Sequence, residues 1–145
     1  MQSSRDECAR SVLEVTPLVT REIRRELRLF GPKNLSMPQF RTLLFLDHHK
    51  GPSMSEVAEH VGLKLASTSV MVDALVKRRL TKRKTRLDDR RCVTLTLTAF
   101  GEATLRSARK ATTVYLAEQF KRLTESDRTN VIRAMQVLRT IFLEK

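Results

Sequence analysis

Apolar residues recur at every third or fourth position through the first part of the chain, with arginine and glutamate between them. This pattern predicts one amphipathic helix over residues 5–30. Pro17 interrupts it and, with Thr16 before it, has the form of a helix start, so we expect a kink or a restart there. Gly31-Pro32 ends the segment. The stripe consists of Cys8, Val12, Val15, Val19, Ile23, Leu27 and Phe30.

Three short helices are predicted next. Ser36–Gln39 and Ser53–Glu56 both have the form of a capping box, in which a serine and a residue three positions later begin a helix. The first of these helices runs to about His49, and Gly62 supplies the left-handed position that ends the second. A third helix covers about residues 65–79. Two helices joined by a turn with a glycine are typical of a DNA-binding helix-turn-helix.

The apolar period then changes from about 3.6 residues to 2. Val93, Leu95 and Leu97 alternate with threonines, which predicts a half-buried strand. Residues 81–86 are polar and basic, and residues 87–90 have the composition of a turn. Together these segments predict an antiparallel hairpin, or wing, directly after the third helix.

The remainder is predicted to be helical, over about residues 99–122 after a cap at Thr98, and again after Thr124. The fold class is therefore mainly α with a small β-wing, in one domain over residues 1–145. Residues 34–98 form a winged helix-turn-helix DNA-binding lobe, flanked by a helical dimerisation region at 1–33 and 99–145. The apolar stripes of the flanking helices exceed what so small a lobe covers, which favours a homodimer. The alternative is that these helices pack on their own lobe.

Charge is concentrated in one part of the chain. The net charge is +12, and residues 64–91 alone carry ten Lys/Arg against three Asp/Glu. So uneven a distribution is typical of a surface that binds a polyanion such as DNA. The alternative is a basic surface patch with no nucleic-acid partner.

The third predicted helix carries the first set of candidate DNA-binding residues. Small polar and apolar side chains on its outer side can meet base edges, phosphates and thymine methyl groups. For each serine, a hydrogen bond within its own helix is an equally good interpretation. Lys64 lies at the helix N-terminus, where backbone N–H groups favour phosphate, and Asp73 is expected to orient a neighbouring Arg or Lys. The set is Lys64, Ala66, Ser67, Ser69, Val70, Asp73 and Lys77.

The predicted wing carries the second set. A guanidinium at a hairpin tip fits the negative potential of a narrow minor groove. Asp89, two residues before Arg91, can hold that arginine in a fixed fork geometry. An ordinary charged hairpin is the alternative. The set is Arg83, Lys84, Arg86, Asp89, Arg90 and Arg91.

Other classes of protein have little support in the sequence. It contains no glycine-rich phosphate loop, nucleophile elbow or metal-ligand quartet, so we expect neither an enzyme nor a metal or cofactor site. Cys8 and Cys92 form no CxxC motif, which fits a reducing compartment. No apolar run reaches the roughly 20 residues that span a bilayer, and the N-terminus lacks a secretory apolar region. We therefore expect a cytoplasmic protein that does not enter a membrane.

Two stretches of the sequence resemble a known family. Residues 89–101, DRRCVTLTLTAFG, resemble the wing of MarR-type regulators, which commonly reads D-x-R, alternating apolar residues, then L-T-x-x-G. Residues 63–83, including MVDALVKRRLTKR, resemble the recognition helix of that family and its exit. The similarity is specific over about residues 36–104, and the flanking helices match in length and order.

The resemblance implies a homodimeric winged helix-turn-helix regulator, usually a repressor that binds a double-stranded DNA operator. Many members are released from DNA by a small phenolic or other anionic aromatic effector, bound between the dimerisation helices and the DNA-binding lobe. The aspartate of D-x-R falls on Asp89 and the minor-groove arginine on Arg91.

The sequence departs from the family pattern in three places. Arg79 occupies a position where the family often has Gly, so the third helix is expected to end without a left-handed glycine cap. Lys64 stands where a capping Ser or Asp is common. A branch of the family senses peroxides through a cysteine in its first helix, but Cys8 lies nearer the N-terminus than that position. A cysteine-based redox sensor, a sequence-indifferent architectural DNA-binding protein, and a basic protein docking on anionic membrane or an acidic partner remain alternatives.

Overall fold

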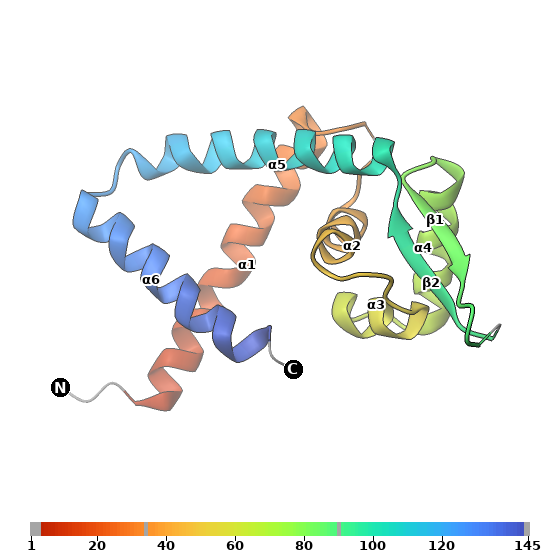
Figure 1. The fold of residues 1–145 in the computed structure, drawn as a ribbon. Helices are drawn as coiled ribbons and strands as arrows, with labels where there is room; N and C mark the ends of the chain where they lie inside the picture. The colour runs from red at the N-terminus through yellow and green to blue at the C-terminus, as the bar shows by residue number, and fades with distance from the viewer. Residues whose placement is uncertain (1–3, 34, 90, 144–145) are drawn as a thin grey trace. The chain divides into compact units, whose positions relative to one another are not determined.

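The computed structural model describes residues 4–33, 35–89 and 91–143, which divide into two compact units, Met1–Thr112 and Thr113–Lys145. The described elements follow the order predicted from the sequence (Figure 1). They are α1 (Arg5–Phe30), α2 (Met37–His48), α3 (Met54–Val61), α4 (Leu65–Lys77), β1 (Thr81–Thr85), β2 (Val93–Leu97), α5 (Ala99–Phe120) and α6 (Glu125–Phe142). The predicted class, mainly α with a small β-wing, is confirmed.

Helix α1 is continuous through Pro17, so the restart expected there is wrong. A proline inside a helix removes the N–H that would bond to the carbonyl four residues earlier, here that of Leu13. Leu13 is largely exposed to solvent. Water can therefore take the place of the missing donor, and the helix continues at low cost.

The helix-turn-helix begins as its capping residues predict. In α2, the Gln39 N–H donates to Ser36 Oγ over 3.2 Å, and the Ser36 N–H donates to Gln39 Oε1 over 3.0 Å. The same reciprocal pair joins Ser53 and Glu56 at the start of α3. Gly62 ends α3 with φ = 75°, a left-handed conformation that glycine adopts without steric cost.

Strands β1 and β2 form the predicted antiparallel hairpin, with Thr81 opposite Leu97 and Thr85 opposite Val93. Further support comes from the α2–α3 loop, because the Leu95 N–H donates to the Pro52 carbonyl over 3.0 Å. The middle of the wing is thereby held against the helix-turn-helix.

Helix α4 ends in a left-handed residue after all, although that residue is not glycine. Arg79 has φ = 60°, the one positive value among the described residues other than glycine. The Arg79 N–H donates to the Val76 carbonyl over 2.9 Å, and the Leu80 N–H donates to the Leu75 carbonyl over 3.0 Å. These two bonds are the Schellman arrangement, which needs a left-handed residue between them. Arginine adopts that conformation at a cost of roughly 1–2 kcal/mol.

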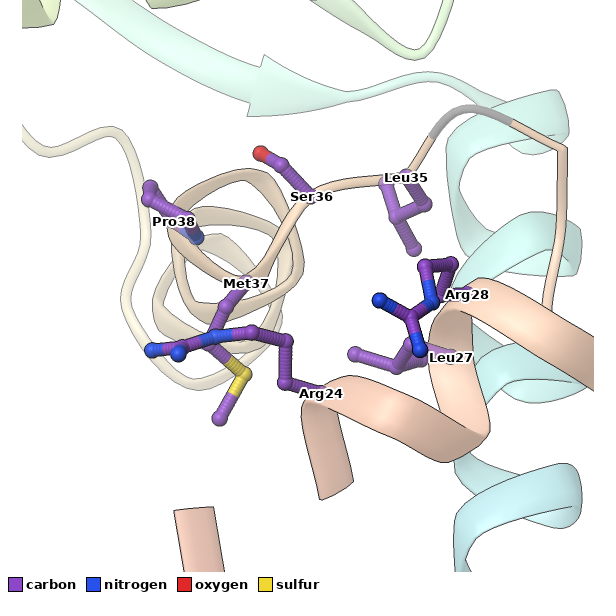
Figure 2. A pocket seen from close by; sticks show the side chains of 7 residues that line it. All are labelled: Arg24, Leu27, Arg28, Leu35, Ser36, Met37 and Pro38. Atoms are coloured by element: carbon purple, nitrogen blue, oxygen red, sulfur yellow. The ribbon is translucent and has the colours of Figure 1, made fainter. Parts of the chain in front are cut away.

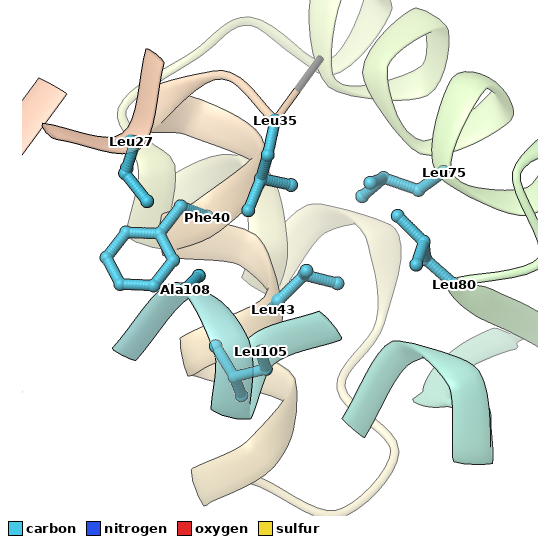
Figure 3. Packing of buried hydrophobic residues seen from close by; sticks show 8 residues of the cluster. All are labelled: Leu27, Leu35, Phe40, Leu43, Leu75, Leu80, Leu105 and Ala108. Atoms are coloured by element: carbon cyan, nitrogen blue, oxygen red, sulfur yellow. The ribbon is translucent and has the colours of Figure 1, made fainter. Parts of the chain in front are cut away.

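Two apolar clusters hold the first unit together. One joins the end of α1 to α2, α4 and α5 (Figure 3), and its members include Leu43, Leu75 and Leu80, which are fully buried. The other cluster packs α2 and α3 against the wing through Val57, Val72 and Leu95, among others. Together, the two clusters therefore support both the helix-turn-helix and the wing.

The second unit differs, because no described residue of α6 is buried. The helix is locally well formed: the Asp127 N–H donates to Thr124 Oγ1 over 3.1 Å, which caps its first turn. Its apolar side chains nevertheless lie largely exposed. They are Val131, Ile132, Met135, Val137, Ile141 and Phe142.

Candidate nucleic-acid interface

The N-terminus of α4 has free backbone donors. Lys64 occupies the cap position and makes no side-chain hydrogen bond to the helix, whereas α2 and α3 are each closed by a serine. The first N–H groups of a helix have no carbonyl partner within it. They and the exposed Lys64 side chain are therefore suited to a phosphate, which agrees with the role predicted for Lys64.

The two sides of α4 are as the helical pattern predicts. Thr68, Val72 and Leu75 are buried against the rest of the lobe. On the opposite side the candidate residues face solvent, and Val70 is 71% exposed, a high value for an apolar side chain. Ser69 is half-buried, while Ala66, Ser67, Asp73 and Lys77 are exposed.

Asp73 does not stand alone on this surface. Its carboxylate forms an ion pair with the guanidinium of Arg83, on strand β1. The prediction that Asp73 orients a neighbouring basic side chain is confirmed, and Arg83 is that neighbour. The pair joins helix α4 to the wing.

A second ion pair lies near the wing tip. Arg86 donates to both carboxylate oxygens of Asp88, from Nε over 3.0 Å and from Nη2 over 2.8 Å. This hydrogen-bonded guanidinium lowers the pKa of the Asp88 carboxyl, and the carboxylate raises the pKa of Arg86. The sequence analysis had not singled out Asp88, although the i, i+2 spacing from Arg86 in a hairpin was a usable signal. Leu87, between them, is fully exposed.

Asp89 organises the turn through the backbone. Its Oδ1 accepts from the Arg91 backbone N–H over 3.0 Å, and its carbonyl accepts from the Cys92 N–H over 3.0 Å. The predicted fork between Asp89 and the Arg91 guanidinium is thus replaced by a contact that fixes the backbone from which Arg91 projects. Arg91 is exposed, and Arg90 lies outside the described residues.

The remaining exposed cations of α4 and the wing are called the basic face below. Strand β1 is exposed from its second residue to its last, and Lys82 and Lys84 alternate with Arg83 along it. This basic face consists of Lys64, Lys77, Lys82, Lys84 and Arg91. All five residues belong to the lobe that the two apolar clusters hold together.

A cavity of about 550 Å³ lies between α1 and the start of α2 (Figure 2). Arg24 and Arg28 of α1 border it, and Ser36 lies at its edge with its hydroxyl directed away (Figure 2). Apolar side chains form the rest of the wall: Leu27, Leu35, Met37 and Pro38. The family resemblance implies a ligand site between the flanking helices and the lobe, but none of these lining residues was predicted, because the cavity arises where two helices meet.

Other chemistry has no comparable site among the residues that the structure describes. No group of three His, Cys, Asp or Glu side chains within them could hold a metal ion. None of the described helices combines the length and apolar character needed to cross a membrane. Cys8 and Cys92 are free thiols, the first exposed and the second half-buried.

Comparison with known protein sequences gives two matches. The model of the MarR family matches residues 35–93, the helix-turn-helix and the start of β2. The uncharacterized HTH-type transcriptional regulator YfiV of Bacillus subtilis is 28% identical over 105 residues. That stretch covers 72% of this chain and 66% of YfiV, just under two thirds of the relative.

Solved structures share the fold. The transcriptional repressor CouR, bound to a 23-mer DNA duplex, is 24% identical with a TM-score of 0.71, over 97% of this chain and 99% of that one. The Mycobacterium tuberculosis MarR family protein Rv2887, in complex with p-aminosalicylic acid, is 22% identical with a TM-score of 0.73. That match covers 90% of this chain and 96% of Rv2887.

Proposed function

Because the chain belongs to the MarR family, we propose that it is a homodimeric, sequence-specific transcriptional regulator, a repressor whose DNA binding responds to a small ligand. The observation that carries this proposal is the basic face of α4 and the wing. Helix α4 enters the major groove, where Ser67, Ser69 and Val70 meet base edges. Arg91 reaches the adjacent minor groove from the wing. The DNA duplex bound by CouR supports this mode of binding.

Arginine, asparagine and glutamine, which read bases by paired hydrogen bonds, are absent from the middle of α4. Sequence preference therefore depends on apolar contact with thymine methyl groups and on the shape of the DNA. A narrow minor groove has a more negative potential and favours an inserted guanidinium. The operator is accordingly expected to contain an A·T-rich step beneath each wing.

Dimerisation is supported by the exposed apolar side chains of the terminal helices. Helix α1 leaves Leu13, Val15 and Leu18 largely exposed, and α6 has no buried residue among those described. Burying these stripes against a second copy removes them from water and creates a two-fold axis. One recognition helix reads only a few base pairs, so two copies also supply the length of site that specificity needs.

The effector is proposed to be a small aromatic carboxylate in the cavity between α1 and α2. Arg24 and Arg28 would bind its carboxylate, since guanidinium groups match that geometry, and the apolar wall would cover its ring. The p-aminosalicylic acid complex of Rv2887 supports this class of ligand. Occupation of the cavity would move α1 against the helix-turn-helix and weaken DNA binding.

The decisive experiment compares two fluorescent duplexes, one from the intergenic region upstream of the gene and one of random sequence. Operator binding is expected to exceed random binding by at least about 10³-fold. Arg91→Ala should weaken operator binding by about 1–3 kcal/mol without changing the dimer. Arg106→Ala removes an exposed arginine from α5, outside the basic face, and should leave binding unchanged. Equal affinity for both duplexes would instead identify an architectural DNA-binding protein.

The effector is tested by adding salicylate to the operator complex. Release of DNA from the wild-type protein, and loss of that release in Arg24→Ala and Arg28→Ala, is the expected result. Both variants should bind operator normally without salicylate, because neither residue belongs to the basic face. Release that persists in both variants would remove this cavity from the proposal.

A further inference from the structure

We propose that Asp73 and Arg83 are a positioning pair, which sets the orientation of the wing relative to helix α4 without contacting DNA. This inference rests on the proposed DNA-binding function. It removes two residues from the sequence-based set of DNA contacts and gives them a different role. The hairpin is attached to the rest of the lobe at several points.

The first attachment is at the base of the hairpin. Leu80, between α4 and β1, is fully buried, and its carbonyl accepts from the Thr98 N–H over 3.1 Å. A Cβ built on Gly101 would lie 1.9 Å from the Leu80 carbonyl oxygen, so the start of α5 is in direct backbone contact with this point. The hairpin therefore leaves α4 from a fixed position.

A further attachment lies midway along β2, where the Leu95 N–H donates to the Pro52 carbonyl over 3.0 Å, but it ties the wing to the α2–α3 loop and not to α4. The Asp73–Arg83 ion pair joins the wing directly to α4, because Arg83 is the third residue of β1 and Asp73 lies in the third turn of α4. Arg83 pairs with Leu95, whose buried side chain belongs to the lobe core. With these attachments in place, the orientation of the wing relative to α4 is set before DNA arrives.

The chemistry of the pair argues against a phosphate contact. The Arg83 guanidinium is already bonded to a carboxylate, which compensates its charge and would repel an approaching phosphate. Both side chains are partly exposed, and such surface pairs contribute little to stability. A carboxylate on a DNA-binding surface is therefore useful mainly through the geometry that it imposes. Lys82 and Lys84, on either side of Arg83, are exposed and are the cations of this strand that would bind phosphate.

The test measures operator affinity at several salt concentrations for full-length Arg83→Gln, Asp73→Asn and the double variant. A phosphate contact contributes about 0.9 to the slope of log K against log salt, and a positioning residue contributes nothing. Arg83→Gln is expected to weaken operator binding about 10-fold with an unchanged slope, in the range of a lost interface contact. Asp73→Asn should also weaken operator binding, although it removes a negative charge from the basic face. The double variant should be no weaker than either single one, because both remove the same attachment.

Two further readouts make the result specific. Binding to random DNA should be unchanged in all three variants, since it depends on charge more than on the wing angle. Lys84→Gln is the matched control and should lower the salt slope by about 0.9. A lower slope for Arg83→Gln, or stronger binding to both duplexes by Asp73→Asn, would overturn the inference while leaving the proposed function intact. A wild-type protein that does not distinguish operator from random DNA would instead overturn the proposed function.

Discussion

Helices α4 and α6 are both amphipathic and both well formed, yet they differ in how far their apolar side chains are buried. Three residues of α4 are buried, and two of them, Val72 and Leu75, belong to the apolar clusters of the first unit. Helix α6 is longer and has no buried residue among those described. The first helix is stabilised within its own lobe, and the second depends on something outside its own unit. This difference is what we expect of a chain whose lobe folds by itself and whose α6 packs in the proposed dimer.

The largest effect on stability is expected when core volume is removed from α4. Leu75→Ala should lower the free energy of unfolding by about 2–5 kcal/mol, because the cavity that it leaves is lined by fully buried neighbours. Val70→Ala, on the exposed side of the same helix, is the matched control and should change stability by less than about 0.5 kcal/mol. Urea unfolding followed by circular dichroism measures both. Equal losses would mean that the exposed side of α4 is covered.

The next largest effect is expected in α6. Ile132 is 59% exposed within a single chain, and Ile132→Asp would place a charge in the proposed dimer interface. The dimer dissociation constant should rise at least about 30-fold, an effect of about 2 kcal/mol or more. Sedimentation equilibrium measures it, with Asn130→Asp as the control of equal charge change on the same helix. A variant that stays dimeric while its lobe is destabilised would instead show that Ile132 stabilises the lobe and not the dimer.

A smaller effect, and one of opposite sign, is expected where α4 ends. Arg79→Gly should raise the free energy of unfolding by about 1 kcal/mol, because glycine adopts the left-handed conformation without the cost that arginine has. The gain should appear as a higher urea midpoint. Arg79→Ala removes the same charge but keeps the strain, so it should show no gain. A gain in the alanine variant would assign the effect to charge.

The smallest effect is a loss of stability at acidic pH. The His60 ring stacks on Phe45, and its pKa is lowered first by burial and then by the nearby charges of Arg41 and His49. The unfolded chain therefore binds a proton more readily, and stability should fall as the pH drops below about 6.5 towards the folded pKa. His60→Phe keeps the stacking and should reduce the loss of stability between pH 7.5 and 5.5. An unchanged pH dependence would assign the acid sensitivity to other groups.

The sequence predicted every element of the lobe for physical reasons that are local. Capping boxes at Ser36 and Ser53 satisfy donors within four residues, and the alternation from Val93 to Leu97 follows from one face being buried. The features that it missed depend on contacts between distant segments. Arg79 takes a glycine conformation because Leu75 and Leu80 are both held in the core, which is not visible from one position.

The candidate site follows the same division. Which side of α4 faces outward could be predicted, because helical periodicity alone decides it. The partner of Asp73 was foreseen only as a basic neighbour, since Arg83 is ten residues away and reaches it through the hairpin. The residues that line the cavity beside Arg24 and Arg28 were missed because they come from α1, from the segment before α2 and from the first turn of α2.

Thr98 separates the last residue of the wing from the first residue of α5. Its hydroxyl donates to the Arg79 carbonyl over 2.5 Å and accepts from the Gly101 N–H over 2.9 Å. One side chain thus bonds both to the segment that follows α4 and to the first turn of α5. The wing and α5 are therefore joined without a linker. We expect a rotation of α5 about its axis to move the wing, which we propose contacts DNA.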